Sequence, residues 1–243
     1  MKPDKIIAVR NNKTVYKDSD SCLKVFSRDF SKIDILNEAL NQARVEETGL
    51  NIPKIKSVTL IDGKWTIISD YIRGKTLSRL MLEHPEKTDE YIKQLVDIQS
   101  EMHTKSCPML NRLRDKTLEK LRLAQLDSSV LQRLCAQLDE MPEADNLCHG
   151  DFRPSNVVIS DNGAYILDWS HASCGNRVLD AAVSYLLLYL HNTSDDAEIY
   201  LQMFCEKNGI DSAYIKKLLP AAAAAQISKG NEKEREFFNS WIK

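Results

Sequence analysis

Two oxygen-bearing side chains at the ends of a predicted hairpin could together hold a hydrated metal ion. Asn156 precedes the apolar run 157–159, and Asp168 follows a second apolar run, 164–167. The residues between the runs, Ser-Asp-Asn-Gly at 160–163, are typical of a tight turn, so the runs are predicted to pair as antiparallel strands. Because pairing brings the ends of a hairpin together, the amide and the carboxylate are expected to lie side by side. Both are oxygen ligands suited to Mg²⁺.

A third polar residue, Asp151, lies five positions before Asn156 in a stretch that reads His-Gly-Asp. This spacing matches the catalytic loop of phosphoryl-transfer kinases, in which the aspartate accepts the proton of a substrate hydroxyl and the asparagine binds metal. Each part alone has a structural alternative, because His-Gly-Asp is common and Asp-Asn-Gly at 161–163 could serve only the turn. The ordered combination, completed by Asp-Trp at 168–169, is more specific and favours a kinase-like site.

On these residues the stretch resembles the aminoglycoside phosphotransferase and choline kinase group of small-molecule kinases. Protein kinases have His-Arg-Asp in the loop and Phe-Gly after the metal aspartate, whereas this chain has His-Gly-Asp and Trp169. Gly175 and Asp180 resemble the glycine and aspartate that follow the metal aspartate in the small-molecule group. The resemblance implies an α+β, protein kinase-like fold with two lobes. The small lobe would hold an antiparallel sheet and one helix, and the larger lobe would be mainly helical.

The expected domains are a small nucleotide-binding lobe, 1–73, and a large helical lobe, 74–243, that carries the catalytic loop and the acceptor site. In the small lobe, strands are predicted over 6–9, 14–16, 22–26, 57–61 and 65–69, with a helix from Ser31 to about Thr48 that Gly49 ends. In the large lobe, helices are predicted over 88–105, 111–139 (as one or two), 181–191, 196–207, 221–229 and 232–242. The first of these is expected to begin at a Thr/Asp cap.

Lys24 lies inside the third predicted strand. In a kinase-like small lobe that strand supplies the lysine that contacts the α and β phosphates, so the resemblance implies this role, with an outward lysine on an edge strand as the alternative. Glu38 shares one face of the predicted helix with the apolar residues Ile35 and Val45. Because a carboxylate on a partly apolar face needs a cationic partner, Glu38 is predicted to pair with Lys24.

The resemblance also assigns the chemical roles. Asp151 would orient and deprotonate the acceptor hydroxyl, and Asn156 and Asp168 would hold Mg²⁺ against the nucleotide phosphates. Arg153 would neutralise developing negative charge, with a loop-bracing arginine as an equal alternative. Asp180 would brace the catalytic loop through its backbone amides. The cofactors implied are ATP, with GTP left open, and Mg²⁺.

Nucleotide binding involves two further segments. The backbone of Asp70, Tyr71 and Ile72 is expected to hold the adenine edge in the linker between the lobes. The segment 10–13, between the first two strands, contains no glycine, although glycine ordinarily lets a backbone approach phosphates closely. Asn11 or Asn12 is expected to supply a left-handed residue there instead.

Two function classes follow from these residues. The first is an ATP-dependent phosphotransferase that acts on a hydroxyl of an aminoglycoside, an amino alcohol or a sugar-like acceptor. The alternative is a catalytically silent kinase-like protein that binds a nucleotide or another ligand. The complete set of Lys24, Asp151, Asn156 and Asp168 favours turnover, because inactive relatives tend to lose one of these residues while a glycine-poor loop is tolerable.

Composition and charge limit the classes of molecule that are expected as partners. The net charge of −2 provides no basic field for nucleic acid, and no apolar run approaches the ~20 residues of a membrane span. The six cysteines are scattered without a Cys-x-x-Cys pair, which is typical of reduced thiols in a cytoplasmic protein. Monomer and homodimer stay open.

The sequence gives a weaker indication of the charge of the acceptor molecule. Residues 171–212, which line the acceptor side in the family, contain six acidic and two basic residues. This excess suits a cationic acceptor, since a cleft of one sign concentrates the opposite one. The alternative is a set of solvated helix surfaces.

Overall fold

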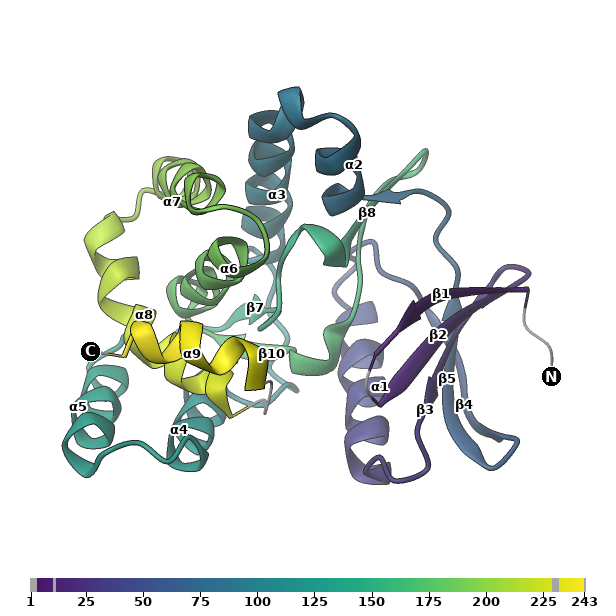
Figure 1. Ribbon diagram of the computed structural model, residues 1–243, viewed down its shortest axis with the longest axis horizontal. Coiled ribbons are helices and arrows are strands. Elements are labelled where there is room, and N and C mark those ends of the chain that lie inside the picture. Colours follow the sequence, from purple (N-terminus) through teal and green to yellow (C-terminus); the bar gives the residue numbers. More distant parts are fainter. Residues whose placement is uncertain (1–3, 11, 229–231, 243) are drawn as a thin grey trace. The chain divides into compact units, whose positions relative to one another are not determined.

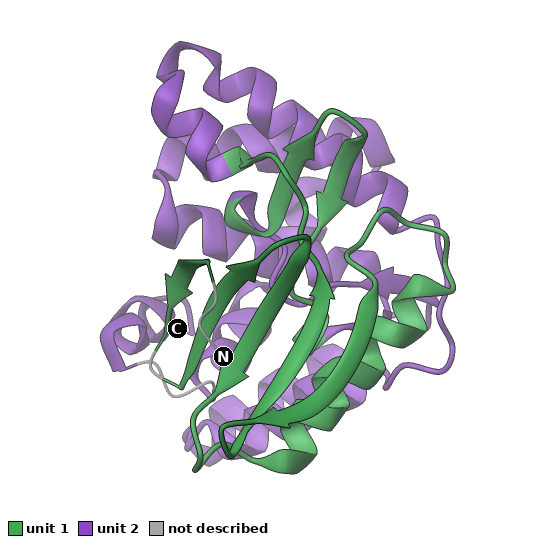
Figure 2. Cartoon of the chain, turned by 90° about the vertical axis from the view of Figure 1, so that its right-hand side faces the viewer, with its two compact units in different colours: residues 1–77, 155–171 green, residues 78–154, 172–243 purple. Residues whose placement is uncertain are grey.

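The computed structural model describes residues 4–10, 12–228 and 232–242. The chain forms two compact units, Met1–Leu77 with Ser155–His171 and Ser78–Pro154 with Ala172–Lys243 (Figure 2). We call them the N-terminal unit and the helical unit. Antiparallel sheet dominates the first and helices the second, so the predicted α+β class is confirmed. The expected functional division after residue 73 concerns nucleotide and acceptor binding, and it stays a prediction.

The N-terminal unit is built on an antiparallel sheet with the five strands that were predicted, and their order is β1-β2-β3-β5-β4 (Figure 1). Its strands are β1 (Lys5–Val9), β2 (Lys13–Asp18), β3 (Ser21–Phe26), β4 (Ile55–Ile61) and β5 (Lys64–Asp70). One helix, α1 (Lys32–Glu46), lies along this sheet. The Ser31 hydroxyl caps it by accepting from the Asp34 amide at 3.3 Å, and Gly49 lies beyond its end with φ 76°.

Helix α1 is held to the sheet by a small apolar core. Phe26 of β3, Ile67 of β5 and Ile35 and Ala39 of α1 are all buried together. The helix residues lie four positions apart, which places them on one face. Glu38 is on the same side of the helix and is only 7% exposed, so the packing that fixes α1 also fixes this carboxylate.

A second sheet in this unit has the order β6-β8-β9. Its strands are β6 (Lys75–Thr76), β8 (Val157–Ser160) and β9 (Gly163–Ile166). The β8–β9 register pairs Val157 with Ile166 and Ser160 with Gly163, so the predicted hairpin is confirmed and its loop is two residues long. Before β6, Gly74 has φ 157°, and a Cβ there would stand 2.1 Å from the Ile159 carbonyl oxygen. Only glycine permits this close strand approach.

The helical unit contains most of the helices. They are α2 (Leu77–Glu83), α3 (Thr88–Met102), α4 (Leu113–Leu123), α5 (Ser128–Asp139), α6 (Arg177–His191), α7 (Ser194–Asn208), α8 (Ser212–Ile227) and α9 (Glu232–Ser240), with Leu77 counted in the N-terminal unit. Two short strands, β7 (Asn146–Cys148) and β10 (Ser173–Gly175), pair antiparallel. Helix α6 is buried along most of its length and packs against α7 and α8, as its apolar sequence predicts (Figure 1).

Two sequence expectations for these helices are wrong. Helix α8 begins at Ser212 and continues through Pro220 rather than beginning after it. The alanines at 221–225 are buried, so close packing outweighs the hydrogen bond that proline cannot make. Helix α3 begins after Lys87, whose side chain makes no cap, so the expected Thr/Asp cap is absent. No helix of the described residues has both the length and the apolar character that crossing a membrane requires.

Candidate active site

The β8–β9 hairpin sets the positions of the two predicted metal ligands. The Leu167 amide donates to the Asn156 carbonyl at 2.8 Å, which closes the base of the hairpin immediately before Asp168. Asp168 has φ 60°, a left-handed backbone that costs a residue other than glycine on the order of 1–3 kcal/mol. The hairpin thus brings the two predicted ligands to neighbouring backbone positions, and Asp168 has a left-handed backbone that the surrounding structure must support.

Lys24 joins Asp168 to helix α1. Its ammonium donates to Oε1 of Glu38 and to Oδ1 of Asp168, the latter at 3.2 Å. The predicted pair of Lys24 and Glu38 is therefore present, and Asp168 is an additional partner that lies 144 positions away in the chain. Three segments of the N-terminal unit, β3, α1 and the loop after β9, meet at this one ammonium.

The charges of this group are mutually stabilised. Burial disfavours a charged lysine, but the Asp168 and Glu38 carboxylates outweigh it and raise the pKa of Lys24 above its ordinary value. Burial would likewise favour a neutral Asp168, but the Lys24 and Lys13 ammonium groups hold the pKa of this carboxyl well below its usual range. At neutral pH Lys24 is thus a cation and Asp168 an anion, as phosphate and metal binding require.

Sequence reasoning missed Lys13, the first residue of β2. Its Nζ lies 3.6 Å from Oδ2 of Asp168 and 3.9 Å from Oε2 of Glu38. The signal that would have found it is the β2–β3 register, which pairs Lys13 with Phe26 and Val15 with Lys24. Because cross-strand partners point to one face, both lysines lie on the face that α1 covers. We call Lys13, Lys24, Glu38 and Asp168 the phosphate-and-metal cluster, after the ligands that the sequence predicts for Lys24 and Asp168.

The loop after Asp168 is anchored within the same unit. The Trp169 indole is buried and donates to the Ile166 carbonyl at 3.1 Å. The Asn41 amide of α1 donates to the Ser170 carbonyl at 3.3 Å. These bonds hold the residues on both sides of Asp168 and so support its left-handed conformation.

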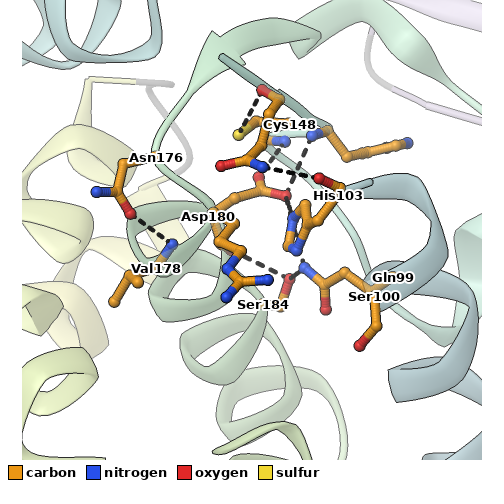
Figure 3. Close-up of polar contacts among 12 residues, drawn as sticks. Gln99, Ser100, His103, Cys148, Asn176, Val178, Asp180 and Ser184 are labelled. Carbon is orange, nitrogen blue, oxygen red and sulfur yellow. Dashed lines mark hydrogen bonds and ion pairs between the residues drawn. The ribbon is translucent and has the colours of Figure 1, made fainter. Parts of the chain in front are cut away.

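In the helical unit, Asp180 of α6 braces the catalytic loop. Its Oδ1 accepts from the Gly150 amide at 2.7 Å, and its Oδ2 accepts from the His149 amide at 3.2 Å. His103 of α3 contacts Oδ2 at 3.0 Å through Nε2 (Figure 3). Burial raises the pKa of Asp180, but His103 and the Gly150 amide lower it more, so it falls below its ordinary value. We call Asp180, His103, His149 and Gly150 the catalytic-loop network.

Further polar groups complete the surroundings of this network. Gln99 of α3 donates to the Ser184 hydroxyl at 2.9 Å (Figure 3). It also accepts from the Tyr200 hydroxyl at 2.7 Å. His103, Cys148 and Asp180 have ligand atoms within 4.8 Å of one another. A metal would need the Cys148 thiolate, yet burial raises the pKa of this thiol well above its ordinary value, and the Asp180 oxygens already accept from backbone amides. The arrangement is a hydrogen-bonded brace.

The braced loop presents Asp151. The Asp151 amide donates to Nδ1 of His149 at 3.2 Å, which fixes that histidine as an acceptor on this side. Arg153 places Nε 3.5 Å from Oδ2 of Asp151, and Phe152 between them is fully buried. Arg153 therefore pairs with the predicted base, a contact that the sequence did not reveal.

The linker residues are placed by the sheet. The Tyr71 amide donates to the Asp20 carbonyl at 3.0 Å, and the Asp70 carboxylate pairs with Lys56 at 3.2 Å. Asp70, Tyr71 and Ile72 line a cavity of about 450 Å³ within the N-terminal unit. Because the Tyr71 amide is engaged, an adenine edge would have to use other backbone groups of the linker.

The expectation of a left-handed residue at Asn11 or Asn12 stays a prediction, because Asn11 lies outside the described residues and the φ angle of Asn12 depends on an atom of Asn11. The Asn12 carbonyl accepts from the Ser27 amide at 2.8 Å, which keeps this residue in the strand pairing.

Comparison with known proteins decides the family. The sequence profile of the phosphotransferase enzyme family matches residues 10–216. The chain belongs to this family. Sequence comparison with curated proteins finds no match.

Solved structures share the family fold. Aminoglycoside phosphotransferase APH(4)-Ia has a TM-score of 0.71 at 15% identity, covering 98% of this chain and 90% of its own. A choline/ethanolamine kinase family protein from Mesorhizobium loti has a TM-score of 0.66 at 13% identity, covering 100% of this chain and 85% of its own. Amicoumacin kinase hAmiN, crystallised with AMP-PNP, Ca²⁺ and Ami, has a TM-score of 0.66 at 13% identity, covering 100% of this chain and 88% of its own. The protein kinase-like fold is thereby confirmed, and with the family it makes this chain a phosphotransferase.

The donor set fits a nucleotide and a divalent cation. Asn156 and Asp168 offer the hard oxygen ligands that Mg²⁺ prefers, at neighbouring positions of one hairpin. Lys13 and Lys24 offer two ammonium groups beside them, as phosphate oxygens require.

Proposed function

We propose that this phosphotransferase moves the γ-phosphoryl group of ATP to a hydroxyl of a small molecule, with Asp151 as the base. The convergence of Lys24, Glu38 and Asp168 carries this proposal, because it joins a strand, a helix and the metal hairpin in one charged group. Phosphoryl transfer leaves a protein little covalent work, so positioning and charge dominate. The bound metal ion would supply charge stabilisation at the transferred group, with Mg²⁺ as the proposed ion and GTP as a competing donor.

Each residue has a role that follows from its contacts. Glu38 orients Lys24, whose ammonium pairs with phosphate oxygens. Asn156 and Asp168 hold the metal ion. Asp151 accepts the acceptor's proton, while Arg153 beside it offers a positive charge for the phosphoryl oxygens. The backbone of Asp70, Tyr71 and Ile72 is the proposed adenine contact.

The acceptor class is the finer part of the proposal. Three acids of the segment 171–212 have structural partners: Asp180 braces the loop, Glu198 bonds Tyr185 and Lys216, and Asp211 caps α8. A fourth acid, Glu206, accepts from the Gln202 amide at 2.9 Å. Asp195 and Asp196 are the acids proposed to attract a cationic acceptor. We propose an amino sugar or amino alcohol, for which KM should rise several-fold between low and high salt as screening weakens the attraction. A KM that is indifferent to salt, or turnover with neutral acceptors alone, would reject a cationic acceptor.

The proposal is tested by phosphate transfer from Mg²⁺–ATP to a panel of aminoglycosides, choline, ethanolamine and simple sugars. Asp151→Asn should fold normally and lose turnover by a factor on the order of 10² or more, the usual scale of general-base catalysis. Asp161→Asn, in the exposed hairpin turn, is the control and should keep full turnover. Near-normal turnover in Asp151→Asn would remove this residue from the role of base. Tight Mg²⁺–ATP binding without transfer to any acceptor would instead favour the silent ligand-binding alternative.

A further inference from the structure

Lys13 occupies the position where a phosphate loop would end. It is the first residue of β2, directly after the glycine-free segment, and it lies on the same face of the sheet as Lys24. The Arg10 amide donates to the Lys13 carbonyl at 2.8 Å, so the Arg10 amide is already hydrogen-bonded within the β1–β2 connection. A glycine-rich loop would bind phosphates with free backbone amides. This connection instead directs a cationic side chain toward the metal hairpin.

The contacts of Lys13 mirror those of Lys24. Lys24 contacts Oδ1 of Asp168 and Oε1 of Glu38, whereas Lys13 approaches Oδ2 of Asp168 and Oε2 of Glu38. Each carboxylate thus faces one lysine with each of its oxygens. The Lys24 contacts are the shorter ones, which makes Lys24 the fixed cation and Lys13 the more loosely held one.

This difference determines what a metal ion would change. If Asp168 contacted a divalent cation, its contact with Lys13 at 3.6 Å would be easier to give up than its contact with Lys24 at 3.2 Å. Lys13 would then lose its nearer partner, since its distance to Glu38 is already 3.9 Å. A lysine has a flexible four-carbon stem that lets the ammonium move to a new anion nearby. The phosphate chain of a bound nucleotide would be such an anion.

We propose that Lys13 is a second phosphate-binding lysine. Its side chain would make the phosphate contact that the backbone amides of a glycine-rich loop ordinarily make. This inference rests on the proposed function, because it names how the same site holds its nucleotide. The competing role for Lys13 is charge balance alone, in which it neutralises Asp168 and Glu38 without contacting the nucleotide. The two roles differ in their dependence on the phosphates.

The test compares ATP with adenosine. Lys13→Met removes the charge and keeps most of the side-chain stem, and Lys64→Met, an exposed lysine on β5, is the matched control. Calorimetry would measure the Kd of each protein for Mg²⁺–ATP and for adenosine. We expect Lys13→Met to weaken Mg²⁺–ATP binding roughly tenfold or more, the scale of one charge-assisted hydrogen bond, and to leave adenosine binding unchanged. Lys13→Arg should restore most of the ATP affinity, and Lys13→Gln serves if the Met variant does not fold.

The other outcomes separate the two proposals. If the unmodified protein binds no Mg²⁺–ATP, the proposed function fails and this inference fails with it. If it binds Mg²⁺–ATP and Lys13→Met binds it equally well, only the role of Lys13 is rejected. Equal weakening of ATP and adenosine, accompanied by a lower Tm, would assign Lys13 to charge balance.

Discussion

The phosphate-and-metal cluster and the catalytic-loop network are both built around an aspartate, but their aspartates contact different kinds of groups. Asp180 is fully buried, and both of its oxygens accept from backbone amides. Asp168 keeps 29% of its side chain exposed, and its two oxygens contact two lysine ammonium groups. Backbone amides cannot leave without unfolding the loop, whereas lysines can exchange one anion for another.

The difference in hydrogen-bond partners distinguishes an aspartate that braces a loop from one that can bind a ligand. A buried carboxylate with amide partners specifies one loop conformation, since losing any partner leaves a buried charge unsatisfied. A partly exposed carboxylate held by flexible cations on a left-handed backbone is arranged to receive a ligand. The comparison predicts that substitution at Asp168 affects activity and that substitution at Asp180 affects stability.

Asp168→Asn should give the largest effect. Asparagine tolerates the left-handed backbone at this position, so the fold is retained while the charged metal ligand is lost. Turnover should fall by a factor on the order of 10³, corresponding to the several kcal/mol that a metal ion contributes to charge stabilisation. The measurement is initial rate against Mg²⁺ concentration, with Asp161→Asn in the same hairpin as control. An unchanged Mg²⁺ dependence would exclude Asp168 as a ligand.

Asp180→Asn should act on stability. The amide can accept through one oxygen only, so one of the Gly150 and His149 amides loses its partner, and His103 loses its anion. Leaving a buried donor without its acceptor costs about 3 kcal/mol in the free energy of unfolding. Urea denaturation would measure it against Asp195→Asn, an exposed residue of the first turn of α7 for which a change of about 0.5 kcal/mol is expected. Equal losses in the two variants would contradict the bracing role.

The sequence predicted most of the elements because their signals are local. The hairpin at 157–166 follows from two apolar runs around a turn, and helix α1 from its Ser31 cap and the later Gly49. Helix α8 was misplaced because proline was taken as a helix start, whereas the buried alanine face holds the helix together across Pro220. Local propensity was overridden there by tertiary packing.

A contact between distant segments could be predicted only where a charged side chain on a buried face needed a partner of opposite charge. Glu38 on an apolar helix face needed a cation, and Lys24 was the candidate. Lys13 was missed because its role depends on strand register, and the partner of His103 was missed because Asp180 lies 77 positions away. The left-handed Asp168 has no sequence signal, since aspartate is common in ordinary conformations as well.

The smallest expected effect is a pH dependence that belongs to Asp180. Its folded pKa lies below the ordinary value because His103 and the Gly150 amide outweigh burial. His149, Cys148 and Tyr200 are further titratable groups that face it. A carboxyl with a lowered folded pKa stabilises the fold above its unfolded pKa of about 3.9, and this stability is lost as the pH falls through the folded pKa. The difference in unfolding free energy between the unmodified protein and Asp180→Asn should therefore shrink as the pH falls below about pH 4. Urea titrations between about pH 5 and pH 3 would measure this difference, which cancels the titration of groups that lie away from Asp180. A difference that stays constant or grows at acid pH would show that the Asp180 charge is not what holds the loop, and the contrast with Asp168 would then rest on hydrogen-bond geometry alone.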